Sequence, residues 1–495
     1  FAFHRVFHIA AGPNATINLN KLTIAGGVLP VGNGAGLLLE ESTLHMETVV
    51  FQHNMTQNEH GGALAVAGGK LVIIGSGFYY NTAFKRGGGL YNVGGTVTIE
   101  NTNFYSNHAT EGAGVANAGN MVITDGHMEK NEASEDGGAI YNSSGNLTLN
   151  ETTLRENQAE YGAGLYNFSG TAFVNDSDIL VNISSNSGGA IYNRRYLQLE
   201  ASQVQNNEAF GGGGIANTGT LTVSRSTVAG NVALTRGGGI ANELGGTITV
   251  NQSTIAANRA TGGMGVERAG GGIFNLNSTA AVNNSTISGN IAEENSGGIS
   301  SHGGTFLLSN STVAFNEAPS WGGVRLGSDG MMQIRNSIVA RNESSDCSIH
   351  PANLNGLIAF NGNLDSDGSC PDFTLSGKDP LLSILMPNGG DAPTHLLDEN
   401  SPAVGAGAVD GCMAMGNVDQ RGLVRVSEGE SSCDLGALEL HGTEPPTATP
   451  EPEVTPEPEV TPEPEVTPEP EVTPIPEETP VISAANSLYL PNVER

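Results

Sequence analysis

Hydrophobic and polar residues alternate with a period of two in many short stretches of this chain. The alternation is clear in residues 147–150, 221–224 and 247–250, where apolar side chains occupy every second position. Together with the abundance of β-branched residues, it predicts half-buried β-strands. No stretch before residue 443 shows the 3.6-residue period of an amphipathic helix. The chain is therefore predicted to be all-β.

The predicted strands recur with a fixed period that two motifs mark. The first motif is a glycine pair followed by an apolar residue and a closing asparagine, as in residues 137–142. Its asparagines are spaced by 25, 25, 25, 26, 24, 25 and 33 residues, at Asn92, Asn117, Asn142, Asn167, Asn193, Asn217, Asn242 and Asn275. The second motif is an apolar residue three positions before another asparagine, at Asn81, Asn107, Asn131, Asn157, Asn182, Asn207, Asn231 and Asn258. A repeat of this length indicates a solenoid whose turns are buried by stacking on their neighbours.

We therefore predict a right-handed parallel β-helix of about twelve rungs with ~25 residues each. Apolar side chains are expected to point inward and to stack in columns. Asparagine tolerates left-handed backbone at a corner, and its amide can bond to the same residue one rung away, so we expect two structural asparagine ladders. The glycine pairs are expected to supply positive φ or close backbone approach at another corner.

Composition divides the chain into five segments. Residues 1–60 are degenerate N-terminal rungs, residues 61–342 are the regular β-helix, and residues 343–442 form an irregular C-terminal region with prolines and cysteines. Residues 443–480 repeat Glu-Pro-Glu-Val-Thr-Pro, which predicts a disordered, extended spacer. Residues 481–495 are a tail segment, either a docking tag or a frayed terminus.

Charge and cysteine content restrict partners and compartment. The net charge of −31 argues against nucleic acid or an anionic membrane as partner. The four cysteines, Cys347, Cys370, Cys412 and Cys433, all follow the repeats, and their spacing suggests the local pairs 347–370 and 412–433, although three connectivities are open. Disulfides predict an extracellular or cell-surface protein. No apolar run approaches the ~18 residues of a membrane span.

One position of the repeat carries aromatic residues. Directly before the closing asparagine stand Tyr91, Tyr141, Tyr166, Tyr192 and Phe274, with alanine in the remaining rungs. This position alternates with an inward apolar residue, so we expect an exposed aromatic stripe that binds sugar rings or a protein partner. The alternative is mutual stacking that only stabilises the sheet. The insertion at residues 261–270 is likewise either a binding edge or a tolerated surface loop.

One segment of the C-terminal region resembles the start of a calcium loop. Asn363, Asp365 and Asp367 place oxygen ligands at alternate positions before a glycine turn. Thr374 stands where the acidic twelfth ligand belongs, so a solvated turn is the alternative. No other cofactor is predicted, because the histidines lack ligand spacing and no glycine string is followed by the GK[ST] of a phosphate loop.

The repeat resembles that of the chlamydial polymorphic outer membrane proteins, whose paired signatures are GGAI and FxxN. GGAI stands at residues 137–140 and 188–191, and FxxN at residues 51–54, 78–81 and 104–107. The resemblance implies a surface-exposed β-helix, and some of those proteins act as adhesins. Their C-terminal transmembrane barrel has no counterpart in this sequence.

The C-terminal region resembles the choice-of-anchor Q domain of secreted bacterial proteins. The matching stretches occur in the family's order, at residues 363–370, 379–382, 388–390, 401–403, 419–422 and 433–439. In that class a β-helix precedes a C-terminal surface-attachment segment, which implies location more than activity.

These observations predict a non-catalytic surface protein whose extended face serves adhesion or structural display, with an extracellular glycan, a protein surface or the cell envelope as partner. The repeat positions are mostly Asn, Ser, Thr and Gly, and carboxylates such as Asp125, Asp136 and Asp176 do not recur in register as an acid and base pair. Two alternatives stay open. One is a β-helix polysaccharide lyase or glycoside hydrolase acting on extracellular glycans, and the other is a passive stalk or filament subunit that self-associates end to end.

Overall fold

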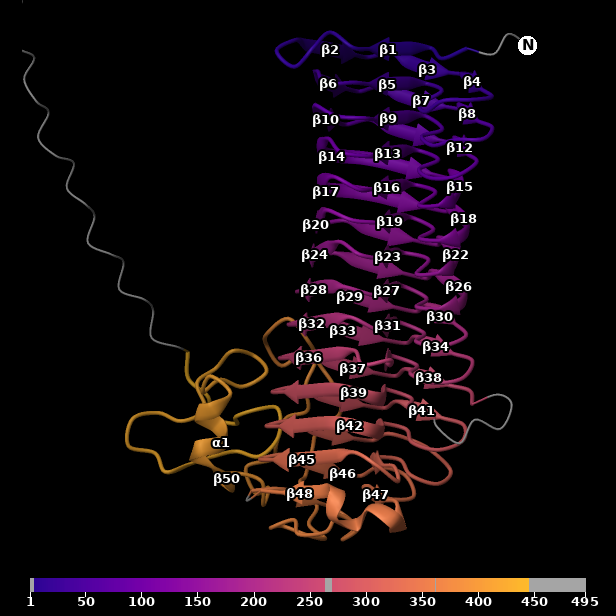
Figure 1. Ribbon diagram of the computed structural model, residues 1–495. Helices are drawn as coiled ribbons and strands as arrows, with labels where there is room; N and C mark the ends of the chain where they lie inside the picture. The colour runs from indigo at the N-terminus through magenta and orange to yellow at the C-terminus, as the bar shows by residue number, and fades with distance from the viewer. Residues whose placement is uncertain (1–3, 263–268, 361, 445–495) are drawn as a thin grey trace, which may run out of the picture. The chain divides into compact units, whose positions relative to one another are not determined.

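In the computed structural model the chain winds into a parallel β-helix of about 14 turns, which confirms the predicted fold class. The structure describes residues 4–262, 269–360 and 362–444, all within one compact unit, Phe1–Pro445. Figure 1 shows the stacked turns, with the C-terminal region beside the later ones. Most of the insertion at 261–270, nearly all of the spacer and the whole tail segment lie outside the described residues.

Equivalent strands of successive turns pair in parallel and form four columns. The first column, which carries the glycine-pair motif, contains β1 (Phe7–Ile9), β5 (Leu37–Leu39), β9 (Leu64–Val66), β13 (Leu90–Asn92), β16 (Val115–Asn117), β19 (Ile140–Asn142), β23 (Leu165–Asn167), β27 (Ile191–Asn193), β31 (Ile215–Asn217), β35 (Ile240–Asn242), the beginnings of β39 (Ile273–Asn283) and β42 (Ile299–Ser309), β44 (Val324–Leu326) and β47 (Cys347–Ile349). The second column contains β2 (Thr16–Asn20), β6 (Thr43–Glu47), β10 (Lys70–Ile74), the beginnings of β14 (Thr96–Tyr105) and β17 (Asn120–Glu129), β20 (Asn146–Asn150), β24 (Thr171–Asn175), β28 (Tyr196–Glu200), β32 (Thr220–Ser224), β36 (Thr247–Asn251), the ends of β39 and β42, β45 (Met331–Arg335) and β48 (Leu357–Ala359).

The third column follows the second across a sharp corner. It contains β3 (Thr23–Ala25), β7 (Val50–Gln52), β11 (Gly77–Tyr79), the ends of β14 and β17, β21 (Thr153–Arg155), β25 (Asp178–Leu180), β29 (Gln203–Gln205), β33 (Thr227–Ala229), β37 (Thr254–Ala256), β40 (Thr286–Ser288), β43 (Thr312–Ala314), β46 (Ile338–Ala340) and β49 (Leu364–Asp365). The fourth column is a separate sheet of β4 (Val28–Leu29), β8 (Met55–Thr56), β12 (Thr82–Ala83), β15 (His108–Glu111), β18 (Glu132–Asp136), β22 (Gln158–Tyr161), β26 (Ile183–Ser187), β30 (Glu208–Ala209), β34 (Val232–Ala233), β38 (Arg259–Ala260) and β41 (Ile291–Ala292).

The structure has more turns than the predicted twelve because the period continues where the motifs fade. The strands β1 to β4 already form a complete turn within residues 1–60. At the other end β47, β48 and β49 pair with β44, β45 and β46, so a further turn reaches to Asp365. A short 3-10 helix, Pro351–Gly356, lengthens this last turn and hides its period in the sequence.

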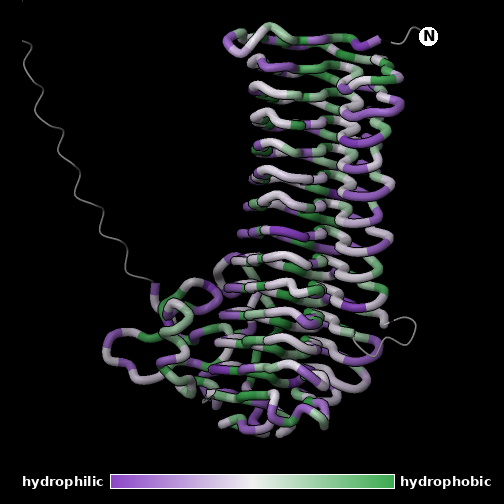
Figure 2. The backbone as a smooth tube through the Cα atoms, viewed as in Figure 1, coloured by the Kyte–Doolittle hydropathy of each residue, from purple (hydrophilic) through white to green (hydrophobic). Residues whose placement is uncertain are grey.

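Inward apolar side chains form one continuous core along the β-helix, as the alternation predicts. Phe51, Phe78 and Phe104 of the second motif stack with ring centroids 4.8 and 4.6 Å apart. Smaller aliphatic residues take over this position in later turns and remain in the same buried cluster. Figure 2 shows hydrophilic and hydrophobic positions alternating along the turns.

The two residues of each glycine pair have different tasks, and both predicted reasons are confirmed in residues 137–142. Gly137 has a φ of 64°, in the left-handed region. Gly138 lies so close to the next turn that a Cβ would meet the carbonyl oxygens of Gln158 and Ala163 at 2.5 and 2.6 Å. Only glycine therefore fits both positions without strain or overlap.

Both asparagine ladders are confirmed. In each, a side-chain Nδ2 donates to the Oδ1 of the equivalent residue one turn later, as between Asn142 and Asn167 (2.9 Å) and between Asn157 and Asn182 (2.9 Å). The ladder residues are nevertheless not the left-handed ones, so this part of the prediction is wrong. In the second-motif ladder the residue before the asparagine takes that conformation, for example Val181 with a φ of 57°.

A third ladder, of hydroxyl groups, lies at the corner between the second and third columns. Backbone N–H groups donate to the hydroxyl of the next turn, as from Thr152 to Ser177 and from Ser177 to Ser202, both at 3.0 Å. The residue before each hydroxyl again has positive φ, whatever its type. These corners fix the outward direction of the side chains that form the candidate site.

The C-terminal region covers the third column from β37 onward. These strands are buried at all three positions, whereas β21 to β33 alternate between buried and half-buried or exposed. The region contains β50 (Gly407–Ala408), α1 (Val409–Ala414) and β51 (Ser432–Cys433). Both predicted disulfides are confirmed, Cys347–Cys370 and Cys412–Cys433. Among the described residues no helix is long and apolar enough to cross a membrane.

Candidate functional site

A row of side-chain amides at the corner between the second and third columns holds the C-terminal region. One amide from each of four successive turns donates to a backbone carbonyl, in the pairs Asn336 to Ala408, Asn310 to Gly411, Asn284 to Met415 and Gln252 to Asp419, at 2.8 to 3.3 Å. The carbonyls of Ala408, Gly411 and Met415 are three and four residues apart because α1 and its two caps run along the β-helix with nearly one helical turn per rung, and Asp419 follows beyond the end of the helix. Because this row of amides ends at Gln252, we expect the C-terminal region to end its contact with the β-helix one turn earlier in the chain.

A groove of about 610 Å³ opens at that point. Its wall on the β-helix consists of corner residues from four turns, and Met415 and Val418 form the opposite wall. The corner residues are Glu200, Ser224, Arg225, Asn251, Gln252, Asn283 and Asn284. The lining is therefore mainly polar and repeats with the turns.

Hydrogen bonds between turns hold the groove side chains in place. Asn283 Nδ2 donates to Asn251 Oδ1 at 3.0 Å, and Arg225 donates to Glu200 Oε1 at 2.7 Å. Arg225 also lies 3.6 Å from the Asp391 carboxylate. The Oδ1 of Asn284 is buried and has no hydrogen-bond partner among the described residues. The groove thus offers donors and acceptors that are already oriented.

The aromatic stripe is not exposed, so its prediction as a surface stripe is wrong. Tyr91, Tyr141, Tyr166 and Phe274 are 8%, 3%, 4% and 0% exposed, and Tyr192 is half-buried. Tyr141 and Tyr166 stack at 5.5 Å, in agreement with the alternative of mutual stacking. Alternation along a strand located the face correctly, but the neighbouring corner residues cover it, and the sequence did not show this.

Charged side chains from the adjacent corner pack against the tyrosine rings and shield them from solvent. The Arg86 guanidinium lies 5.2 Å from the Tyr141 ring centre, and Arg194 donates to the Tyr166 hydroxyl at 3.3 Å. Burial raises the pKa of both tyrosines above its ordinary value. Nearby, burial and then Glu111 raise the pKa of Asp136 to about 7. These side chains pack the corner and are not free to bind a ligand.

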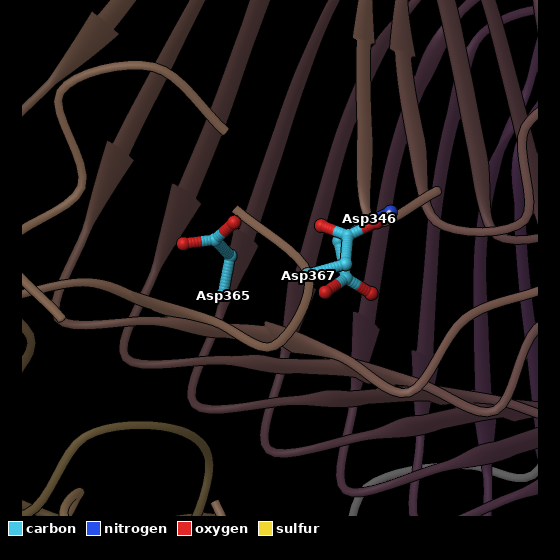
Figure 3. Close-up of side chains that lie close together, drawn as sticks. All are labelled: Asp346, Asp365 and Asp367. Atoms are coloured by element: carbon cyan, nitrogen blue, oxygen red, sulfur yellow. Dashed lines mark hydrogen bonds between the residues drawn. The ribbon is translucent and has the colours of Figure 1, made fainter. Parts of the chain in front are cut away.

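The predicted calcium ligands lie at the last turn, where Asp365 and Asp367 lie beside a third carboxylate, Asp346. Carboxylate oxygens of Asp346, Asp365 and Asp367 lie within 4.8 Å of one another (Figure 3). Asn363 instead accepts the Ser337 N–H at 3.0 Å and ends the hydroxyl ladder. Asp346 accepts two hydrogen bonds from Asn342 and two from Ser366. The oxygens of Asp346 therefore take part in ladder closure, whereas Asp365 Oδ1 is buried and has no hydrogen-bond partner among the described residues, and calcium binding at this cluster stays a prediction.

Sequence reasoning missed Asp346, which lies outside the alternating pattern. It takes the place of the next ladder asparagine only four residues after Asn342. The only signal in the sequence is that a carboxylate follows the last asparagine of the second motif, and this alone does not predict a ladder position.

A buried ionic network holds the end of the C-terminal region. The Arg425 guanidinium donates to the carbonyls of Val418 and Gly436 and lies 3.6 Å from Glu439. Gln420 reaches between Thr254 and Thr286 of the third column, at 2.7 and 2.6 Å. Stretches 419–422 and 433–439 therefore fasten this region to the β-helix.

The network predicts a pH effect at Glu439. Burial and then Asp434 raise the pKa of Glu439 from 4.5 to about 8. A carboxyl with a raised folded-state pKa stabilises the fold at low pH, and this stabilisation is lost as pH rises toward 8. The wild-type melting temperature should therefore fall between pH 5 and 8 more steeply than that of Glu439→Gln. Equal slopes in thermal unfolding series would contradict the assignment.

Comparisons with known proteins identify no family. No protein-family model matches the chain, and no curated protein is similar to it. Among solved structures it is similar to pectate lyase Pel9A, with 14% identity, a TM-score of 0.28, and 87% of this chain and 89% of that chain covered.

Proposed function

We propose that the protein is an extracellular β-helix that binds glycan chains without cleaving them, and so serves adhesion or display. The observation that carries the proposal is the polar groove between the corner residues and the C-terminal region. Polar side chains, mostly amides with a hydroxyl and one arginine, line the groove on successive turns, which are ~4.8 Å apart. A linear polymer of hydroxylated units can meet such a row one turn after another. Two disulfides support a location outside the cytoplasm.

The charge of the chain favours uncharged glycans. With a net charge of −31 it repels anionic polymers at long range. In the groove Arg225 is already paired with Glu200 and Asp391, so little positive charge remains for an acidic sugar. The amides and hydroxyls of the groove carry no charge, and they can form hydrogen bonds with the hydroxyl groups of a neutral sugar.

A glycan array probed with the full chain tests the proposal, and the β-helix offers a matched control. Asn283 and Asn251 bond within the groove, and Asn175 bonds to Asn150 in the same way at 2.9 Å several turns earlier. We expect Asn283→Ala to weaken binding about tenfold, because one hydrogen bond and its orientation are lost. Asn175→Ala should bind like the wild type. No binding by the wild type, or equal losses in both variants, would contradict a site in the groove.

The second candidate function is glycan cleavage, which one observation favours. Arg225, in the groove lining, pairs with both Glu200 and Asp391, so two carboxylates and a basic residue do converge there. Such groups can supply acid and base chemistry. New reducing ends released from neutral polysaccharides, or unsaturated products released from uronic-acid polysaccharides, by the wild type and not by Glu200→Gln, would establish cleavage and refute the non-catalytic proposal.

A further inference from the structure

The column of outward aromatic residues has a gap two turns long. Tyr141, Tyr166 and Tyr192 occupy consecutive turns, with 5.5 and 5.1 Å between neighbouring ring centres. In strict register the next residues are Ala216, then Ala241, and only then Phe274. Since turns are ~4.8 Å apart, the two ends of the gap are about 14 Å apart instead of one stacking distance.

The chain fills only part of this gap. At its other interruption, the single Ala116, the Arg86 guanidinium lies 5.2 Å from the Tyr141 ring centre and covers that ring. In the longer gap Arg236 lies 5.4 Å from the Phe274 ring centre and covers that end alone. The face of Tyr192 toward the alanines has no equivalent cover among the ring and cation contacts of the described residues.

A cavity of about 160 Å³ occupies the remaining space. Ala216 and Ala241, both at most 5% exposed, line it next to Tyr192 and Arg236. This volume corresponds to about five water molecules, enough for one six-membered ring but not for a chain of rings. The cavity therefore has the size of the side chains that the column lacks, and we call it the slot.

The slot combines one aromatic wall with polar groups. Glu243 pairs with Arg236 at 2.5 Å, which neutralises the guanidinium and leaves donors and acceptors side by side. Thr218 and Thr235 add hydroxyls to the lining. At the mouth Phe210 and Leu244 are 52% and 83% exposed, an unusual exposure for large apolar side chains.

We propose that the slot binds a single neutral sugar ring, which stacks its C–H face on Tyr192 and directs hydroxyls to Arg236 and Glu243. An aromatic face supplies apolar contact, and a neutralised ion pair supplies directional hydrogen bonds, which together suit a pyranose. The ring continues the aromatic column where the chain interrupts it. The slot is a separate site from the groove, so it does not depend on the function proposed there.

Filling the slot from within provides the test. Ala216→Tyr adds the side chain that the column itself carries at Tyr192, so the fold should tolerate it while the space disappears. Methyl pyranosides titrated into the full chain, with saturation-transfer NMR, should bind the wild type and lose detectable binding in Ala216→Tyr. Tyr192→Ala should weaken binding about tenfold, the cost of one stacking contact, and Tyr192→Phe should not.

The outcomes separate the slot from the groove. Asn283→Ala, in the groove, should bind methyl pyranosides like the wild type. Absence of pyranoside binding by the wild type, wild-type affinity in Ala216→Tyr, or binding of apolar peptides in place of pyranosides would overturn the proposal. A circular dichroism spectrum and melting temperature like those of the wild type show that Ala216→Tyr is folded, so its loss of binding is assigned to the filled slot.

Discussion

Gly138→Ala is expected to destabilise the β-helix by about 3 kcal/mol, or to prevent its folding, although it adds a single methyl group. The new Cβ would lie 2.5 Å from the Gln158 carbonyl oxygen and 2.6 Å from that of Ala163. Both atoms belong to the backbone of the next turn, which cannot rotate away as a side chain can. Relief requires the two turns to separate, and that breaks the parallel hydrogen bonds between them.

Gly94→Ala is the matched control for this prediction. Its Cβ would have the Ala67 carbonyl oxygen as nearest neighbour, at 3.9 Å, and Gly94 does not have positive φ. Urea unfolding should show that the free energy of unfolding falls strongly in Gly138→Ala and hardly at all in Gly94→Ala. Similar unfolding midpoints would mean that close approach is not why glycine stands at this corner.

Most of the β-helix was predictable because each turn buries the same kinds of side chain at the same positions of the repeat. Alternation identifies inward residues, and a buried amide must find a partner, which an identical amide one turn away supplies. Both ladders were therefore accessible from the repeat, and the cysteine spacing suggested the two disulfides while three connectivities were open. The last turn was missed because Pro351–Gly356 breaks the period while β47, β48 and β49 still pair.

What surrounds the outward side chains was not predictable from the repeat. Tyr141 has the same alternation as an exposed residue, yet Arg86 from another turn covers it. The groove depends on contacts between residues more than 130 positions apart, such as Asn284 with Met415. No local pattern encodes such a contact. The candidate site is thus a property of tertiary packing, whereas the fold is a property of the period.

The ladders also have a direction, which explains why one carboxylate is tolerated in them. Each Nδ2 donates toward the C-terminal end, so every internal member must both accept and donate. The last member only accepts from the ladder, and Asp346 meets this need because Ser366 supplies two donors to its second oxygen, at 2.8 and 2.7 Å. A carboxylate should therefore be acceptable at the end of the ladder and costly inside it.

Asn157→Asp tests this direction and is expected to cost about 3–5 kcal/mol at neutral pH. One carboxylate oxygen would keep the hydrogen bonds from Asn131. The other would replace the Nδ2 that donates to Asn182 Oδ1 and Met128 O, both at 2.9 Å, and would face two oxygens without a donor. Asn157 is fully buried, so water cannot solvate the charge.

The pH dependence of the stability of Asn157→Asp shows whether the charge or the shape of the new side chain causes the loss. The folded-state pKa of the introduced carboxyl should be raised, so the loss of stability should shrink as pH falls from 7 toward the ordinary aspartate value of ~3.9, where the protonated group can donate one bond. Asn146→Asp, at an exposed position, should differ little from the wild type at either pH. A loss at Asn157 that is the same at pH 7 and pH 4 would mean that ladder polarity is not what excludes aspartate.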